Sequence, residues 1–154
     1  MTDKIFETIL FNRKTMASLL ENYTEEQLNS IPGNFKNSLI WNIGHVLVTE
    51  QLLIYKLSGL PLKINESLVP LFAKGTKPEA MVDKKQIEMV KKLLVSTILT
   101  TRKDYHDHLF QKYQSYTTST GIVLNNAEDA LLFNCFHEGI HLGIILSLKK
   151  LVSV

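Results

Sequence analysis

The chain has 154 residues, of which 45% are hydrophobic and 21% are charged, as is usual for a globular protein. This length predicts a single domain spanning residues 1–154, large enough to enclose a hydrophobic core. The net charge of +2, with lysines spread along the chain, argues against nucleic acid or a membrane surface as the partner.

Four segments have the hydrophobic periodicity of amphipathic helices. In chain order they cover about Lys4–Glu21, Asn37–Leu57, Asp83–Tyr105 and Ala127–Leu151. Asp83 and Asn126 are the expected N-caps of the last two helices, because their side chains can accept a hydrogen bond from the first turn. Thr24–Gln27 has the form of a capping box and predicts a short helical turn. The sequence therefore predicts an all-α protein, a four-helix bundle.

The connection between the second and third predicted helices is long and irregular. Ser58–Pro61 ends the second helix, and Pro70, Gly75 and Pro78 interrupt the stretch up to Val82. Antiparallel neighbours need only about 2–8 connecting residues. A stretch of roughly 25 residues is long enough to run back along the bundle. We therefore expect a long crossover, with the third helix parallel to the second.

Three histidines lie on the inward faces of two predicted helices. His137 and His141 are one turn apart on an apolar stripe, so their ring nitrogens can aim at a common point. His45 lies on a similar stripe of the second helix, which consists of Trp41, His45, Val48, Leu52 and Tyr55. Each buried polar group without a partner costs about 1–3 kcal/mol, and one metal ion satisfies a nitrogen on all three rings. The pattern predicts a divalent metal bound by these histidines, with a position left for water.

The segment His137–His141 also matches the H-E-x-x-H motif of zinc metalloproteases, in which Glu138 is the general base. A metzincin has a glycine and then a histidine at fixed later positions, where this chain has Ile144 and Ser147. A thermolysin-like third ligand is missing too, because no acidic residue follows His141. The motif therefore does not predict a protease, and the third ligand lies upstream.

Three histidines lie upstream of this motif. His106 and His108 are two residues apart, so they cannot share a helix face, and their polar surroundings indicate a solvated helix end. His45 has apolar neighbours on both sides of its stripe. We therefore expect His45 to be the third metal ligand.

Three further residues of the fourth helix are close to the predicted ligands. Glu138 projects about 100° away from the stripe, so it is either a catalytic base or supporting partner, or a solvated or dimer-facing charge. Asn134 precedes His137 by one turn and either hydrogen-bonds a ligand histidine or metal-bound water, or is an ordinary core or interface residue. Cys135 faces elsewhere, and we interpret it as a small buried residue rather than a nucleophile.

Four short segments, taken together and in this order, carry a family resemblance: Trp41–His45, Leu57–Pro61, Lys74–Pro78 and His137–Gly143. With them the chain resembles the DinB-like (YfiT-like) metal-binding four-helix bundles over nearly its whole length. The resemblance implies the crossover bundle, a metal held by His45, His137 and His141, and a homodimer. The sequence by itself shows no exposed apolar stripe that demands a dimer. Characterised members of that family include S-transferases that use bacillithiol or mycothiol, and a maleylpyruvate isomerase.

The leading functional hypothesis is a metal-dependent enzyme that acts on a small molecule, as a thiol S-transferase or a hydrolase. The metal would bind a thiol or water and lower its pKa. Zinc or nickel is expected, with a low-molecular-weight thiol as a co-substrate. The alternative is a non-enzymatic binding or stress-response protein with a structural or vestigial metal. Because the ligands must be neutral imidazoles, metal affinity is expected to fall as the pH drops through about 6.5.

Several features predict a soluble, cytoplasmic protein. The single cysteine, Cys135, excludes an internal disulfide and fits a reducing compartment. The segment Met1–Lys4 lacks the apolar core of a signal peptide. No apolar run is expected to approach the length that spans a bilayer.

Overall fold

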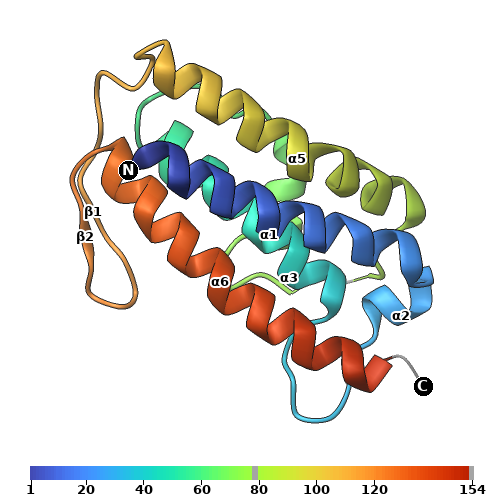
Figure 1. Ribbon diagram of the computed structural model, residues 1–154. Helices are drawn as coiled ribbons and strands as arrows, with labels where there is room; N and C mark the ends of the chain where they lie inside the picture. Colours follow the sequence, from blue (N-terminus) through green and yellow to red (C-terminus); the bar gives the residue numbers. More distant parts are fainter. Residues whose placement is uncertain (78–79, 153–154) are drawn as a thin grey trace.

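Four long helices build the computed structural model, which describes residues 1–77 and 80–152 (Figure 1). They are α1 (Thr2–Asn22), α3 (Leu39–Gln51), α5 (Lys84–His106) and α6 (Ala127–Val152). Within the described residues, β-structure is limited to an antiparallel pair of two-residue strands, β1 (Tyr116–Thr117) and β2 (Val123–Leu124). The all-α four-helix bundle predicted from the periodicity is confirmed.

Local sequence signals determine where the helices begin. The side chain of Thr24 accepts a hydrogen bond from the backbone N–H of Gln27, and the backbone N–H of Thr24 donates to the side-chain oxygen of Gln27, so the predicted capping box starts α2 (Glu25–Asn29). Asp83 forms a second capping box at the start of α5. The side chain of Asn126 accepts from the backbone N–H of Asp129 at 2.8 Å, as expected for the N-cap of α6.

The second predicted helix differs from expectation at its C-terminal end. It was expected to be α-helical to about Leu57, but α3 gives way to a π-helical turn, η1 (Leu52–Lys56). The chain then runs through a 3₁₀ turn, η2 (Glu66–Leu68), and the short α4 (Val69–Phe72) before α5 begins. In Figure 1, α3 and α5 run in the same direction and opposite to α1 and α6, so the predicted crossover is confirmed. Pro78, one of the predicted interruptions, lies outside the described residues.

Two apolar clusters fill the bundle, and a buried polar layer lies between them. Ile9 and Met16 of α1 belong to different clusters, and Arg13 lies between these two residues in sequence. The side chain of Arg13 is fully buried, as are those of Glu50 on α3 and Glu138 on α6. Charged groups therefore meet at the centre of the bundle, beside the segment that carries the histidines.

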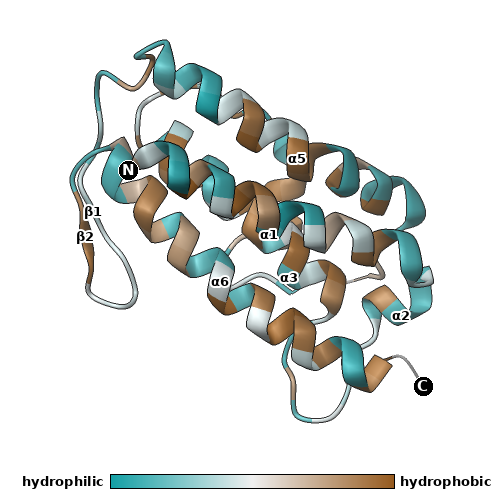
Figure 2. Ribbon diagram, in the orientation of Figure 1, coloured by the Kyte–Doolittle hydropathy of each residue, from teal (hydrophilic) through white to brown (hydrophobic). Residues whose placement is uncertain are grey.

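The helix α6 is apolar along most of its length (Figure 2). By length and composition it is able to cross a membrane, which corrects the expectation that no apolar run approaches that length. The core helix of a globular bundle passes the same test. Here α6 packs along α1 and α3, and it carries the buried polar residues Asn134 and Glu138.

Candidate metal centre

The helices α3 and α6 bring His45, His137 and His141 together. The ring centre of His45 lies 5.1 Å from that of His137 and 4.8 Å from that of His141, and the last two are 4.5 Å apart. One nitrogen from each ring lies within 4.8 Å of the other two. Small ring rotations can bring all three nitrogens to one ion, for which metal–nitrogen distances are about 2.1 Å. The predicted ligand residues therefore form one cluster.

Hydrogen bonds through Nδ1 hold two of the three rings. Nδ1 of His45 lies 2.7 Å from the carbonyl oxygen of Phe72, which can only accept, so this nitrogen carries the proton. Nδ1 of His141 lies 2.9 Å from Oδ1 of Asn42. The amide nitrogen of Asn42 donates to the carbonyl of Ser38, which keeps its oxygen turned toward His141. Both rings therefore present Nε2 without a proton, as metal-bound histidines do.

The third ring, that of His137, lacks such a bond. Its Nδ1 is buried and has no hydrogen-bond partner among the described residues, while the ring stacks against Phe133 at 6.2 Å. A buried nitrogen without a partner costs about 1–3 kcal/mol. A metal bound by three imidazoles gives this ring an interaction that the chain does not supply. The unpaired nitrogen and the all-nitrogen donor set both fit a divalent transition metal.

Burial also keeps the three histidines uncharged. It lowers the pKa of His137 to about 3 and that of His141 to about 4, and repulsion from the neighbouring rings acts in the same direction. Burial likewise lowers the pKa of His45, against the effect of its hydrogen bond to Phe72. Neutral imidazoles have free lone pairs at neutral pH, so the cluster is ready for a metal without releasing protons.

These pKa shifts change the expected pH dependence of metal binding. Protons compete for His141 only near pH 4, so zinc occupancy should persist well below the pH of about 6.5 expected from unperturbed histidines. Equilibrium dialysis with zinc from about pH 7.5 to about pH 4.5 measures this occupancy. A midpoint at about pH 6.5 would mean that the rings titrate as exposed histidines do.

The same shifts predict the stability of the metal-free protein. Histidines of the unfolded chain take up protons near pH 6.5, whereas those of the folded cluster resist protonation down to about pH 4. The unfolded state therefore binds more protons between these values. The free energy of unfolding should be largest above about pH 6.5 and should fall as the pH is lowered toward 4.

A close contact between α3 and α4 positions His45. A Cβ added to Gly44 would lie 2.5 Å from ring atoms of Phe72, so only glycine lets this phenylalanine approach α3. Its carbonyl then reaches His45. On the other side, Trp41 stacks on His45 with ring centres 4.6 Å apart, and its Nε1 donates to Thr76 of the crossover at 3.3 Å. The crossover therefore holds His45 from both sides.

We expect Gly44→Ala to weaken zinc binding about tenfold or more, the usual effect of losing a partner of a ligand histidine. The new methyl group displaces Phe72 and breaks its hydrogen bond to His45. Competition with a chromophoric chelator measures the affinity. Gly139→Ala on α6 is the matched control, because its Cβ would meet nothing within 4 Å. Equal affinities in the two variants would show that Phe72 does not position the ligand.

A cavity of about 300 Å³ opens beside His45 and His137. Its size is at the lower end of that of small-molecule sites, about 300–1,000 Å³. It is lined by residues of α3, of η1 and the residue after it, of the crossover, of the loop with the two strands, and of α6. These residues are His45, Thr49, Leu52, Leu53, Lys56, Leu57, Lys74, Tyr116, Thr118, Ser119, Phe133 and His137. We call it the histidine cavity, and it gives a small molecule access to two of the three rings.

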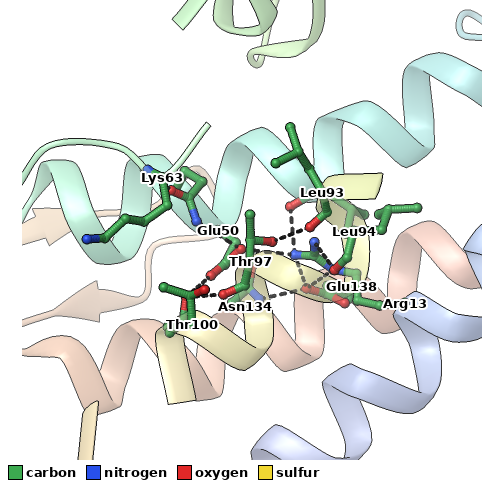
Figure 3. Close-up of polar contacts among 12 residues, drawn as sticks. Arg13, Glu50, Lys63, Leu93, Leu94, Thr97, Thr100, Asn134 and Glu138 are labelled. Atoms are coloured by element: carbon green, nitrogen blue, oxygen red, sulfur yellow. Dashed lines mark hydrogen bonds and ion pairs between the residues drawn. The ribbon is translucent and has the colours of Figure 1, made fainter. Parts of the chain in front are cut away.

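Glu138 and Asn134, the predicted supporting residues, belong to the buried polar layer (Figure 3). Oε1 of Glu138 accepts hydrogen bonds from Nη2 of Arg13 and from Nδ2 of Asn134, both at 2.8 Å, whereas its Oε2 has no partner among the described residues. The reading of Glu138 as a solvated or dimer-facing charge is wrong. The hydrogen bond expected from Asn134 to a ligand histidine is not found, and Asn42 makes that bond instead.

Arg13 and Glu50 also belong to this layer, and neither is among the residues predicted from the sequence. Oε2 of Glu50 lies 3.5 Å from Nη2 of Arg13, and its Oε1 accepts from the hydroxyl of Thr101 at 2.5 Å. Burial raises the pKa of Glu138, against the opposing effect of the arginine. This layer could have been predicted from the sequence, because Arg13 and Glu50 are opposite charges at inward positions of two different helices.

The remaining assignments made from the sequence concern His106, His108 and Cys135. His106 ends α5 with a half-exposed side chain and lies 3.1 Å from Asp3, and His108 is exposed in the left-handed backbone region. Both lie outside the histidine cluster, so the reading as a solvated helix end is confirmed. Cys135 is half-buried rather than fully buried as predicted, and burial raises the pKa of its thiol, which disfavours a nucleophilic role.

Comparison with known proteins gives one family match. The model of the DinB superfamily matches residues 9–145, a span that contains the three histidines, their partners Asn42 and Phe72, and the buried polar layer. A search of curated proteins finds no match.

Proposed function

The chain belongs to the DinB superfamily, and from that premise we propose a metal-dependent enzyme acting on a small molecule, as a thiol S-transferase or a hydrolase. One observation carries the proposal: three neutral histidines converge, two of them line a cavity, and one has a buried nitrogen without a partner among the described residues. The proposed ion is zinc or nickel, with a low-molecular-weight thiol as co-substrate of the transferase. When bound, the metal acts as a Lewis acid and lowers the pKa of a thiol or water that it binds.

Residues of the chain itself prepare this site. Phe72 and Asn42 fix the orientation and tautomer of two of the rings. The hydroxyl of Thr49 lines the cavity 3.3 Å from Nε2 of His45, where it can hydrogen-bond a group of the bound molecule. The apolar ring of Phe133 covers part of the wall and excludes water. Phe72 and Asn42 thus orient the ligand rings, and Thr49 and Phe133 are placed to contact a substrate, whereas the metal would supply the reactivity.

A catalytic role for Glu138 remains a prediction. The carboxylate has one oxygen without a partner, and burial raises its pKa, both of which suit a proton carrier. However, it does not belong to the residues that line the histidine cavity. Glu138→Gln separates the two possibilities, because a base predicts unchanged zinc content and lost activity, whereas a purely structural residue predicts unchanged activity per folded molecule.

The alternative function is a binding or stress-response protein with a structural metal. An enzyme keeps a coordination position accessible to substrate, whereas a structural site is closed. Cobalt-substituted protein distinguishes them, because its visible absorption spectrum reports the ligands of the ion. We expect 2-mercaptoethanol or azide to change the spectrum. A spectrum that ignores both compounds would favour the alternative.

We also propose a homodimer that is formed through the exposed side of α6. This helix presents large apolar side chains to solvent at helical spacing: Leu132, Phe136 and Ile140. Gly139 and Gly143 lie beside them, and nothing is within 4 Å of their added Cβ atoms, so a second helix can approach closely. The structure thus supplies the exposed apolar stripe that the sequence alone did not reveal.

Light scattering at micromolar concentration is therefore expected to give twice the chain mass of 17.6 kDa. Phe136→Glu places a charge on the proposed interface and should give the mass of one chain. Leu99→Glu is the matched control, since Leu99 is a similarly exposed apolar residue on α5. A wild-type mass near 17.6 kDa would contradict the dimer.

Location and other partners follow the same proposal. The single cysteine, Cys135, suits the reducing conditions of the cytoplasm, where we place the protein. The small net charge of +2 gives no reason to add nucleic acid or a membrane surface as a partner.

A further inference from the structure

The charged residues of the histidine cavity all have the same sign. Lys56 of η1 and Lys74 of the crossover line it, and no aspartate or glutamate does. Within residues 1–77 and 80–152, neither lysine has a hydrogen-bond or ion-pair partner.

The remaining wall is largely apolar. Leu53 is buried, and together with Leu52, Leu57 and the ring of Phe133 it forms an apolar surface next to the histidines. Thr49 and Thr118 also line the cavity, and their hydroxyl groups are neutral groups that can form hydrogen bonds with a substrate. A molecule that fills the cavity therefore meets apolar surface on one part and unpaired cations on another.

We propose that this site takes a small organic anion, whose apolar body packs against Leu53 and Phe133 while its charged group pairs with Lys56 and Lys74. An anion gains from two cations in one cavity, whereas a cation of the same shape is repelled. That this anion is a substrate rests on the proposed function, because the cavity is part of an active site only if the protein is a metal-dependent enzyme. Binding of the anion to the lysines does not itself require the metal.

A pair of probes that differ only in charge tests the proposal: 4-phenylbutyrate and its neutral amide, 4-phenylbutyramide. Calorimetry on the zinc-loaded protein should show that the acid binds about tenfold more tightly than the amide. Two ion pairs near the surface give an affinity difference of about this size. In Lys56→Gln/Lys74→Gln the two dissociation constants should come within about twofold of each other. The control Lys85→Gln/Lys92→Gln removes the same charge from the surface of α5 and should keep the preference.

Two results would overturn the proposal. One is an undiminished preference for the acid in Lys56→Gln/Lys74→Gln, which would mean that the carboxylate binds the metal. The other is no binding of either probe at millimolar concentration. His141→Ala removes a ligand that does not line the cavity, and the preference for the acid should survive there without zinc. Zinc content is measured separately, so failure of the metal site is distinguished from failure of anion binding.

Discussion

Replacing His137 by alanine should abolish stoichiometric zinc binding, and the same loss is expected for His45→Ala and His141→Ala. Each variant leaves only two imidazoles, and within the described residues no other histidine, cysteine or carboxylate joins the cluster. Loss of a ligand should exceed the roughly 10–100-fold effect of losing a residue that only supports one. Metal content after dialysis against one equivalent of zinc, measured by elemental analysis, gives the result directly.

The chain contains its own controls for this experiment. His106→Ala and His108→Ala remove imidazoles at the end of α5, outside the cluster, and should leave zinc content unchanged. Circular dichroism shows whether each variant keeps its helices. A folded His45→Ala that retains one zinc per chain would disprove the three-histidine site, because the other two ligands come from one helix.

The histidine cluster could be predicted because helical periodicity alone determines it. Residues four apart on α6 share a face, and the stripe on α3 points His45 at the same interior. The residues that orient the histidine rings could not be predicted from helical periodicity. Asn42 belongs to α3, but Phe72 belongs to the crossover, and its contact depends on how α4 packs against Gly44. Such contacts come from tertiary packing, on which a periodic pattern carries no information.

On α6, the predicted stripe of inward-facing residues does not account for all of the buried and exposed side chains. The projection of Glu138 about 100° from the histidine stripe left both a supporting role and an exposed charge open, and α6 packs against both α1 and α3 and buries this side chain. Conversely, Leu151 at the end of the same predicted apolar helix is half-exposed, whereas the neighbouring Val152 is buried. A sequence pattern identifies one buried face, whereas the number of neighbouring helices decides how many faces are buried.

Arg13→Met should destabilise the protein by about 3–5 kcal/mol, the usual result of removing one partner of a buried ion pair. Arg13 is fully buried and contacts both Glu138 and Glu50, so its loss leaves two carboxylates in the core without a cation. Chemical unfolding followed by circular dichroism measures the change. Arg102→Met is the control, because Arg102 pairs with Asp3 at the surface, where an ion pair contributes little.

The charge left behind, rather than the lost side-chain volume, should account for most of this effect. Methionine fills much of the space of arginine, so adding Glu50→Gln and Glu138→Gln to Arg13→Met should restore most of the stability. The single variant should also gain stability as the pH is lowered. A buried carboxyl without a cation has a raised pKa, so the folded state binds more protons than the unfolded chain. If the triple variant is as unstable as Arg13→Met, the polar layer acts through its packing, and its charges contribute little to the stability of the bundle.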